Sequence, residues 1–251
     1  MPAPAPTRAW GWLAGYRSDV ASNGAGTLAR VDTEAVFAAS ARHRRAVADL
    51  LESLDEDQLA VSSLCAGWDV RTVAAHLASA IAPSNPNRAF MGAVLRHGGN
   101  LRHANGAVAR KTARLPVADI VEILRRHADS RFTPPVTGPR GPLTDVLVHT
   151  GDIRIPLGLS HNPVGAHVRA ALEFVSMGRP VGFVARGRLA GLQLVAEDLD
   201  WRWGAGPDVC GRGIDVLMVA CGRASVLPQL HGPGVETVSA RLNGGRGARH
   251  R

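Results

Sequence analysis

Two carboxylates and an imidazole are spaced for one face of a helix in the segment 142–154. Asp145, His149 and Asp152 are separated by steps of four and three residues. At about 100° per residue, these steps return the three side chains to roughly one stripe of a helix. Carboxylate oxygen and imidazole nitrogen are both ligands of divalent ions such as Zn²⁺. The segment could therefore supply ligands to one ion.

A second imidazole, His76, lies in the helix-like segment 68–79, among small and apolar residues. Burying it there without a polar partner costs about 1–3 kcal/mol, and an ion shared with a second helix would remove that cost. The combined pattern favours a metal site made of His76, Asp145 and His149. Asp152 is then a fourth ligand or the acceptor that orients His149. The alternative is a capped helix with solvent-facing carboxylates and structural histidines, because Asp-x-x-x-His has low specificity.

The other chemically active residues are given no role. The remaining histidines have mostly polar or arginine neighbours and are expected at the surface, including His43, His97, His103, His127 and His161. The three cysteines, Cys65, Cys210 and Cys221, lack the Cys-x-x-Cys spacing of zinc ribbons and thioredoxin-like sites. Cys65 precedes a helix start, where a thiol pKa can be lowered, but a small buried residue is the expected role.

Composition excludes several classes of protein. The 251 residues carry a formal charge of +8, but the cations are dispersed arginines without interleaved aromatic residues, so nucleic acid is not favoured as a partner. No apolar run reaches the roughly 20 residues of a membrane span, and the N-terminus lacks a secretory pattern, so the cytoplasm is expected. A G-x-S-x-G motif, a P-loop and a dinucleotide fingerprint are all absent from the sequence.

Hydrophobic periodicity divides the chain into three parts. Residues 1–30, rich in Pro, Ala and Gly, are expected to be a flexible extension; residues 31–180 a helical bundle; and residues 181–251 a small α/β region with a basic tail. Helices are expected at about 32–54, 69–82, 88–114 (with a possible break), 117–127, 145–156, 165–177 and 214–221. Strands are expected at 189–196 and 199–203, a turn at 204–206 and a loop at 133–142.

Three ordered motifs resemble one family. The segment 65–77, CAGWDVRTVAAHL, is similar to the C-x-G-W-x-V-R-x-x-x-A-H-L segment of the maleylpyruvate isomerase family of mycothiol-dependent enzymes, in the DinB-like metalloenzyme superfamily. Residues 145–158, DVLVHTGDIRIPLG, resemble the second metal-binding helix of that family. Residues 192–207, LQLVAEDLDWRWGAGP, resemble its C-terminal region. Together the motifs place about residues 31–245 within the resemblance.

The resemblance implies a mainly α fold, a DinB-like four-helix bundle followed by a small C-terminal α/β appendage. It also implies one divalent ion, usually zinc, held by His76, Asp145 and His149. The first-described members have glutamate, whose side chain is one methylene longer, where this chain has Asp145. Mycothiol would be the thiol cosubstrate, and its metal-bound thiolate would attack a small electrophilic substrate, leading to isomerisation or to S-transfer.

The resemblance further implies roles for other polar residues. Asp152 would orient His149 or relay a proton, and Arg154 would bind an anionic thiol or substrate unless it is simply a surface arginine at a helix end. The family isomerase also uses an arginine from its C-terminal domain, for which Arg202 and Arg223 are the candidates. The alternative function is a non-catalytic metal- or thiol-binding bundle acting in stress response. Substrate and oligomeric state are left open.

Overall fold

The computed structural model describes residues 33–82, 101–134, 137–177, 180 and 182–247. Several expectations lie outside this part of the chain: the flexible N-terminal extension, the first half of the segment 88–114, His97, the side chain of His103 and the end of the basic tail. Contacts unite residues 31–251 in one compact unit. The boundary near residue 180 therefore stays a prediction.

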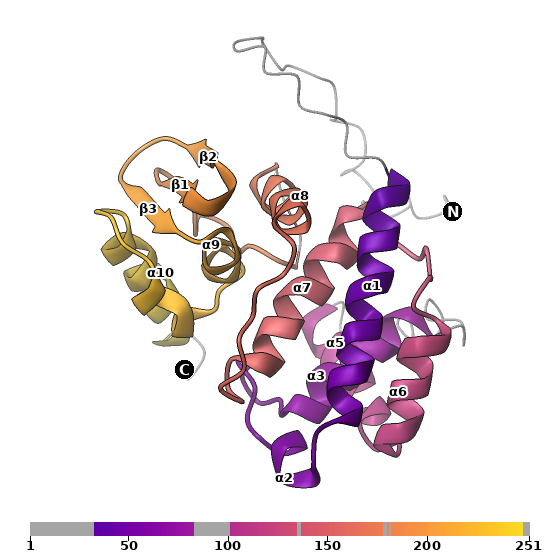
Figure 1. The fold of residues 1–251 in the computed structure, drawn as a ribbon. Helices are drawn as coiled ribbons and strands as arrows, with labels where there is room; N and C mark the ends of the chain where they lie inside the picture. The colour runs from indigo at the N-terminus through magenta and orange to yellow at the C-terminus, as the bar shows by residue number, and fades with distance from the viewer. Residues whose placement is uncertain (1–32, 83–100, 135–136, 178–179, 181, 248–251) are drawn as a thin grey trace, which may run out of the picture. The chain divides into compact units, whose positions relative to one another are not determined.

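Helices make up most of the described chain, as expected (Figure 1). α1, α3, α6 and α7 pack together as a bundle, with α5 against α3 and α8 against α7. Their shared core is aliphatic, with many fully buried alanine, valine and leucine side chains. The bounds are α1 Thr33–Glu52, α2 Glu56–Leu59, α3 Val70–Ile81, α5 Leu101–Thr112, α6 Val117–Arg126, α7 Arg140–Arg154 and α8 Gly165–Ser176.

Local sequence explains where the two central helices begin. Asp69 caps α3, because its carboxylate accepts a hydrogen bond of 2.7 Å from the backbone N–H of Thr72. α7 begins at Arg140, earlier than expected, although Pro142 is its third residue. Proline is tolerated there because backbone N–H groups in the first turn have no partner within the helix. The loop expected at 133–142 therefore ends before residue 140, because residues 140–142 belong to α7.

The C-terminal region contains a small three-stranded sheet with the order β2-β1-β3. β1 pairs with β2 in antiparallel fashion and with β3 in parallel fashion, so that Gln193 lies between Gly204 and Asp208. The bounds are β1 Gln193–Ala196, the 3₁₀ turn η1 Glu197–Leu199, β2 Trp201–Gly204, β3 Asp208–Gly211, α9 Gly213–Ala220, the 3₁₀ turn η2 Ala224–Gln229 and α10 Val235–Gly247.

The expected turn at 204–206 is an arch that carries the chain across the start of β1. Gly204 and Gly206 have positive φ angles of 89° and 127°. A Cβ at either residue would lie 2.3 Å from a carbonyl oxygen, that of Leu192 or of Gly191. Only glycine fits at both points. β3 was not expected, since the pattern suggested a simple turn after two strands.

α9 joins this region to the bundle. All its residues are buried, and it contacts α7, α8, β1 and β3. Apart from Asp215, which pairs with Arg212, its residues are apolar or glycine, as is typical of a helix in a core. The approach to α7 is close at Gly151, where a Cβ would lie 2.8 Å from Met218 Cε. α9 therefore places the residues that follow it beside the centre of α7.

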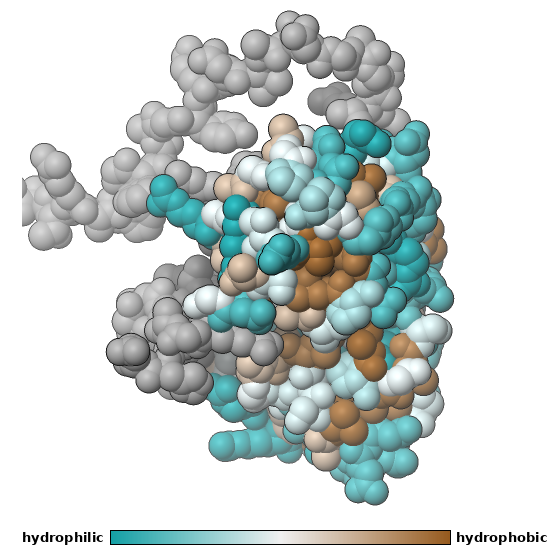
Figure 2. Space-filling view, turned by 90° about the vertical axis from the view of Figure 1, so that its left-hand side faces the viewer, coloured by the Kyte–Doolittle hydropathy of each residue, from teal (hydrophilic) through white to brown (hydrophobic). Residues whose placement is uncertain are grey.

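The face that carries the C-terminal region has mixed hydropathy. Figure 2 shows hydrophobic residues there in separate patches between hydrophilic ones. Among the described residues, none of the helices has the length and apolar character needed to cross a membrane.

Candidate metal centre

α3 and α7 bring His76, Asp145 and His149 together. His76 Nε2 lies 3.6 Å from Asp145 Oδ2, and His149 Nε2 lies 3.4 Å from Asp145 Oδ1. The two imidazole rings meet edge to face, with centroids 4.9 Å apart. One donor atom from each residue falls within 4.8 Å of the other two. The spacing expected from the sequence has thus produced one cluster from two helices.

The distances from Asp145 to the two imidazoles are longer than good hydrogen bonds and are compatible with one shared ion. Zinc ligands lie about 2.0–2.2 Å from the metal, so two ligand atoms at a tetrahedral angle are about 3.4 Å apart. The carboxylate of Asp145 has this spacing to the Nε2 atoms of His76 and His149. Good hydrogen bonds would be about 0.5 Å shorter. Three such donors match the ligand set of a divalent ion with a fourth position open.

Burial and charge act against each other at Asp145 and His149. Burial alone would raise the pKa of Asp145, but His149 and His76 lower it overall. Burial alone would lower the pKa of His149, but the carboxylates of Asp145 and Asp152 raise it well above its usual value. The surroundings of these side chains therefore favour a positive charge between the carboxylates, which a proton or a metal ion can supply.

The second ring nitrogen of His149 is oriented by Asp152. Nδ1 donates a hydrogen bond of 2.8 Å to Asp152 Oδ2, which leaves Nε2 to face Asp145. Asp152 is fully buried. Both of its oxygens are already engaged, so the geometry is that of an orienting acceptor and not of a fourth ligand.

Arg223, which follows α9, binds the same carboxylate through two hydrogen bonds. Its Nε donates to Asp152 Oδ1 at 2.9 Å and its Nη2 to Asp152 Oδ2 at 2.6 Å. Burial would raise the pKa of Asp152, but the bonds from His149 and Arg223 lower it well below its usual range. Of the two candidate arginines, Arg223 reaches the cluster, whereas Arg202 lies on β2 with an exposed side chain.

Cys65 also belongs to the cluster, contrary to its expected role as a small buried residue. Its half-buried Sγ lies 3.1 Å from Asp152 Oδ2, 3.4 Å from Arg223 Nη2 and 3.7 Å from His149 Nδ1. The loop before α3 is tied there by a hydrogen bond of 3.2 Å from Leu64 N–H to the carbonyl of Asp152. The position of Cys65 before a helix start was visible in the sequence, but nothing in the residue spacing linked Cys65 to α7.

Arg154 contacts the segment that follows α7. It is half-buried at the end of α7, and its Nε donates to the Ser160 carbonyl at 2.6 Å. Trp68, by contrast, lies against the candidate ligands, with its ring centroid 5.3 Å from that of His76 and 6.4 Å from that of His149. The indole therefore covers one side of the pair of imidazoles.

Two histidines expected at the surface lie inside. His161 is only 9% exposed and donates through Nε2 to the Leu147 carbonyl at 3.1 Å. Burial lowers its pKa to about 4. His43 is half-buried with Nε2 3.0 Å from His167 Nδ1, and burial with the nearby His167 lowers its pKa to about 4. Polar sequence neighbours misled here because these contacts join distant segments.

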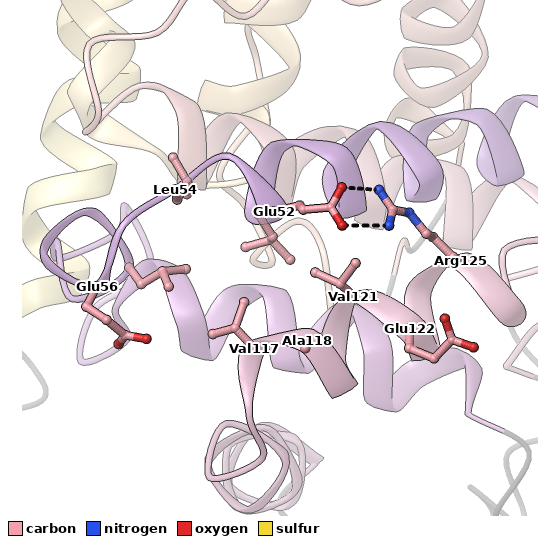
Figure 3. Close-up of a pocket in the computed structure, with 10 residues that line it drawn as sticks. Glu52, Leu54, Glu56, Val117, Ala118, Val121, Glu122 and Arg125 are labelled. Carbon is pink, nitrogen blue, oxygen red and sulfur yellow. Dashed lines mark hydrogen bonds and ion pairs between the residues drawn. The ribbon is translucent and has the colours of Figure 1, made fainter.

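A pocket of about 370 Å³ lies elsewhere, between the end of α1, α2 and α6 (Figure 3). Glu52 and Arg125 face each other across its upper edge, joined by two hydrogen bonds. It shares no lining residue with the metal cluster. It is therefore not the candidate centre.

Comparison with known proteins agrees with these observations. Residues 40–133 match the family model described as the mycothiol maleylpyruvate isomerase N-terminal domain. Over this range the chain is similar to that family. The resemblance inferred from the motifs is thereby confirmed, although the matched range contains His76 and Cys65 but not α7 or Arg223.

Solved structures of the mycothiol-dependent maleylpyruvate isomerase have the same fold. A histidine-to-alanine mutant of that enzyme aligns with a TM-score of 0.50 and 16% identity, over 80% of this chain and 92% of its own. A second structure of the isomerase gives a TM-score of 0.49 with the same identity and coverage. At this identity the likeness describes the fold alone. No curated protein sequence matches the chain.

Proposed function

We propose that this protein is a metal-dependent, mycothiol-using isomerase or thiol S-transferase. The observation that carries the proposal is the set of His76, Asp145 and His149 donors, spaced for one ion and backed by a buried Asp152. The family match supplies the thiol, since residues 40–133 match a domain named for mycothiol. We place the activity in the cytoplasm on the basis of the sequence.

His76, Asp145 and His149 would hold the ion, with zinc the first expectation for two imidazoles and one carboxylate. When bound, the ion supplies positive charge that favours the thiolate form of a thiol at neutral pH. Asp152 fixes the tautomer and direction of His149, and Arg223 keeps Asp152 ionised and in place. Their contribution is preorganisation, because they hold the donors before any ligand arrives.

For isomerisation, the thiol sulfur would form a bond to one carbon of a C=C double bond conjugated to a carbonyl, and the π electrons would move onto the carbonyl oxygen. After rotation about the resulting single bond, these electrons return, the C–S bond breaks, and the product is an isomer with the thiol regenerated. If a leaving group departs with the bonding electron pair, the sulfur stays attached and the reaction is S-transfer. Arg154 stays a candidate for binding an anionic part of thiol or substrate through its terminal nitrogens, since only Nε is engaged with Ser160.

Metal content and activity should be measured together on wild type, His76→Ala, His149→Ala and the control His127→Ala. His127 lies at the end of α6, outside the cluster. We expect each cluster variant to hold one ion per chain fewer than wild type and to lose activity at least 100-fold, while His127→Ala keeps both. Maleylpyruvate tests isomerisation and monochlorobimane tests S-transfer, each with mycothiol.

This experiment distinguishes the metal-dependent enzyme from the non-catalytic bundle, the two functions inferred from the sequence. An ion lost from both variants without turnover of either electrophile would favour the non-catalytic metal- or thiol-binding bundle. If wild type and the two variants have equal metal content after reconstitution, the proposed centre does not exist.

A further inference from the structure

A second group of metal-binding side chains lies on the C-terminal sheet, apart from the bundle. Cys210 on β3 pairs with Val195 on β1 and, on its other side, with His231. Cys210 and His231 exchange two backbone hydrogen bonds, of 2.8 and 3.0 Å. Residues directly opposite each other in a ladder project to the same face. The backbone therefore fixes the thiol and the imidazole side by side.

Glu197 completes the group from the 3₁₀ turn that follows β1. Its Oε1 lies 3.2 Å from His231 Nε2. One donor atom each from Glu197, Cys210 and His231 lies within 4.8 Å of the other two. The thiol is half-buried, whereas the side chains of His231 and Glu197 are 62% and 52% exposed. An ion could thus reach the group from solvent without any movement of the sheet.

Charge at this place differs from the rest of the molecule. The whole chain carries a net charge of +8, but Glu197 and Asp208 add negative charge beside Cys210, and Arg202 only partly offsets them. A cation bound between the donors would offset this negative charge, because it binds the thiolate directly and one proton leaves to solvent.

We propose that Glu197, Cys210 and His231 form a second site, for a divalent ion of the zinc class. A thiolate and an imidazole select zinc and similar borderline ions, whereas magnesium and calcium prefer oxygen ligands alone. Three protein ligands leave one position for water. The ion would join η1, β3 and the segment before α10, three segments that otherwise meet through backbone pairing and the Glu197–His231 contact.

Cobalt(II) is the probe that separates this site from the bundle. Thiolate bound to Co²⁺ absorbs in the near ultraviolet, and none of the proposed bundle ligands is a thiol. The titration is made on the full chain carrying His76→Ala and His149→Ala, so that the bundle set is removed. We expect saturation at one ion per chain with a thiolate-to-cobalt band, which zinc then displaces.

Matched cysteine variants in that background identify the ligand. Cys210→Ser should abolish the band, and His231→Ala should weaken cobalt binding at least tenfold. Cys65→Ser and Cys221→Ser should both keep the band. No band in the starting variant, or a band that survives Cys210→Ser, overturns the proposal.

A measurement on the wild-type bundle guards against variants that fail to fold. After excess zinc is removed by gel filtration, the wild type should hold one zinc ion per chain more than Cys210→Ser. The rise in Tm from chelator to zinc should also be several degrees larger for the wild type than for Cys210→Ser. Equal zinc content in the two proteins contradicts the site. The result does not depend on whether the bundle centre is catalytic.

Discussion

Arg223 and Asp152 are 71 residues apart and form a buried, two-bonded ion pair, with donor–acceptor distances of 2.9 and 2.6 Å. The side chain of Asp152 is fully buried and that of Arg223 is 16% exposed. The pair joins the C-terminal region to α7 at the residue that orients His149. Packing between the two regions and the geometry of the candidate metal centre are thus connected through one carboxylate.

Replacing Arg223 should affect both stability and metal binding. Arg223→Ala leaves Asp152 buried with His149 and Cys65 as its remaining side-chain partners, and breaking a buried pair in this way costs about 3–5 kcal/mol. Arg223→Lys restores the charge but not the two-bonded geometry, so we expect an intermediate loss. Urea unfolding and zinc competition measure the two effects. Wild-type zinc affinity in a folded Arg223→Ala protein would show that the pair does not support the centre.

Asp145→Glu tests whether this chain is adapted to the shorter acid. The carboxylate of Asp145 already lies 3.4 and 3.6 Å from the two Nε2 atoms, so an added methylene should crowd the cluster. We expect zinc affinity to fall about tenfold, as for other disturbances around a metal site. Competition with a chromophoric chelator measures it, with Asp145→Asn as the charge control. Tighter binding by the glutamate variant would indicate that the aspartate is a compromise.

Cys65→Ala separates a supporting thiol from a reacting one. A thiol is a weak hydrogen-bond donor, and Asp152 keeps its bonds from Arg223 and His149. We therefore expect stability to change by less than about 1 kcal/mol and turnover with mycothiol to fall less than tenfold. Turnover at background level, in a protein that still binds its metal, would instead make Cys65 the nucleophile.

His161 gives the folded protein a defined sensitivity to acid. Its pKa is lowered to about 4 by burial, against about 6.5 in an unfolded chain. The folded state therefore binds its proton less readily, so stability is complete above pH 6.5 and falls by about 3 kcal/mol as the pH drops toward 4.

The fall should be measured by urea unfolding in chelator, so that metal release does not contribute. His161→Gln keeps a donor for the Leu147 carbonyl but does not titrate, and its stability should be flatter over the same range. Parallel curves for the two proteins would assign the acid sensitivity to other groups, His43 among them.

The elements and one side of the centre were predictable because both follow from local periodicity. The steps from Asp145 to His149 and Asp152 fix a shared helix face wherever that helix lies, and apolar neighbours marked His76 as inward-facing. Neither signal contains the distance between two helices. The pairing of α3 with α7 came from chemistry, since a buried imidazole needs a partner.

What the sequence could not reveal depends on contacts between distant segments. Arg223 could not be distinguished from Arg202 as the C-terminal arginine of the site, because nothing in the local sequence shows that α9 lies against Gly151. β3 was missed because a parallel pair leaves no short hairpin signal, and the Gly204–Gly206 arch has the composition of an ordinary turn. Cys65 reaches Asp152 only because the preceding loop bonds to α7.

Trp68 gives the centre an optical signal of its own. Its indole ring lies within 6.4 Å of both candidate imidazole ligands, at the end of the loop that also carries Cys65. Indole emission depends on whether a neighbouring imidazole is neutral, protonated or bound to a metal. The chain has five tryptophans, so the difference in fluorescence between the wild type and Trp68→Phe can follow the occupancy of the centre in solution, without a dye and without turnover.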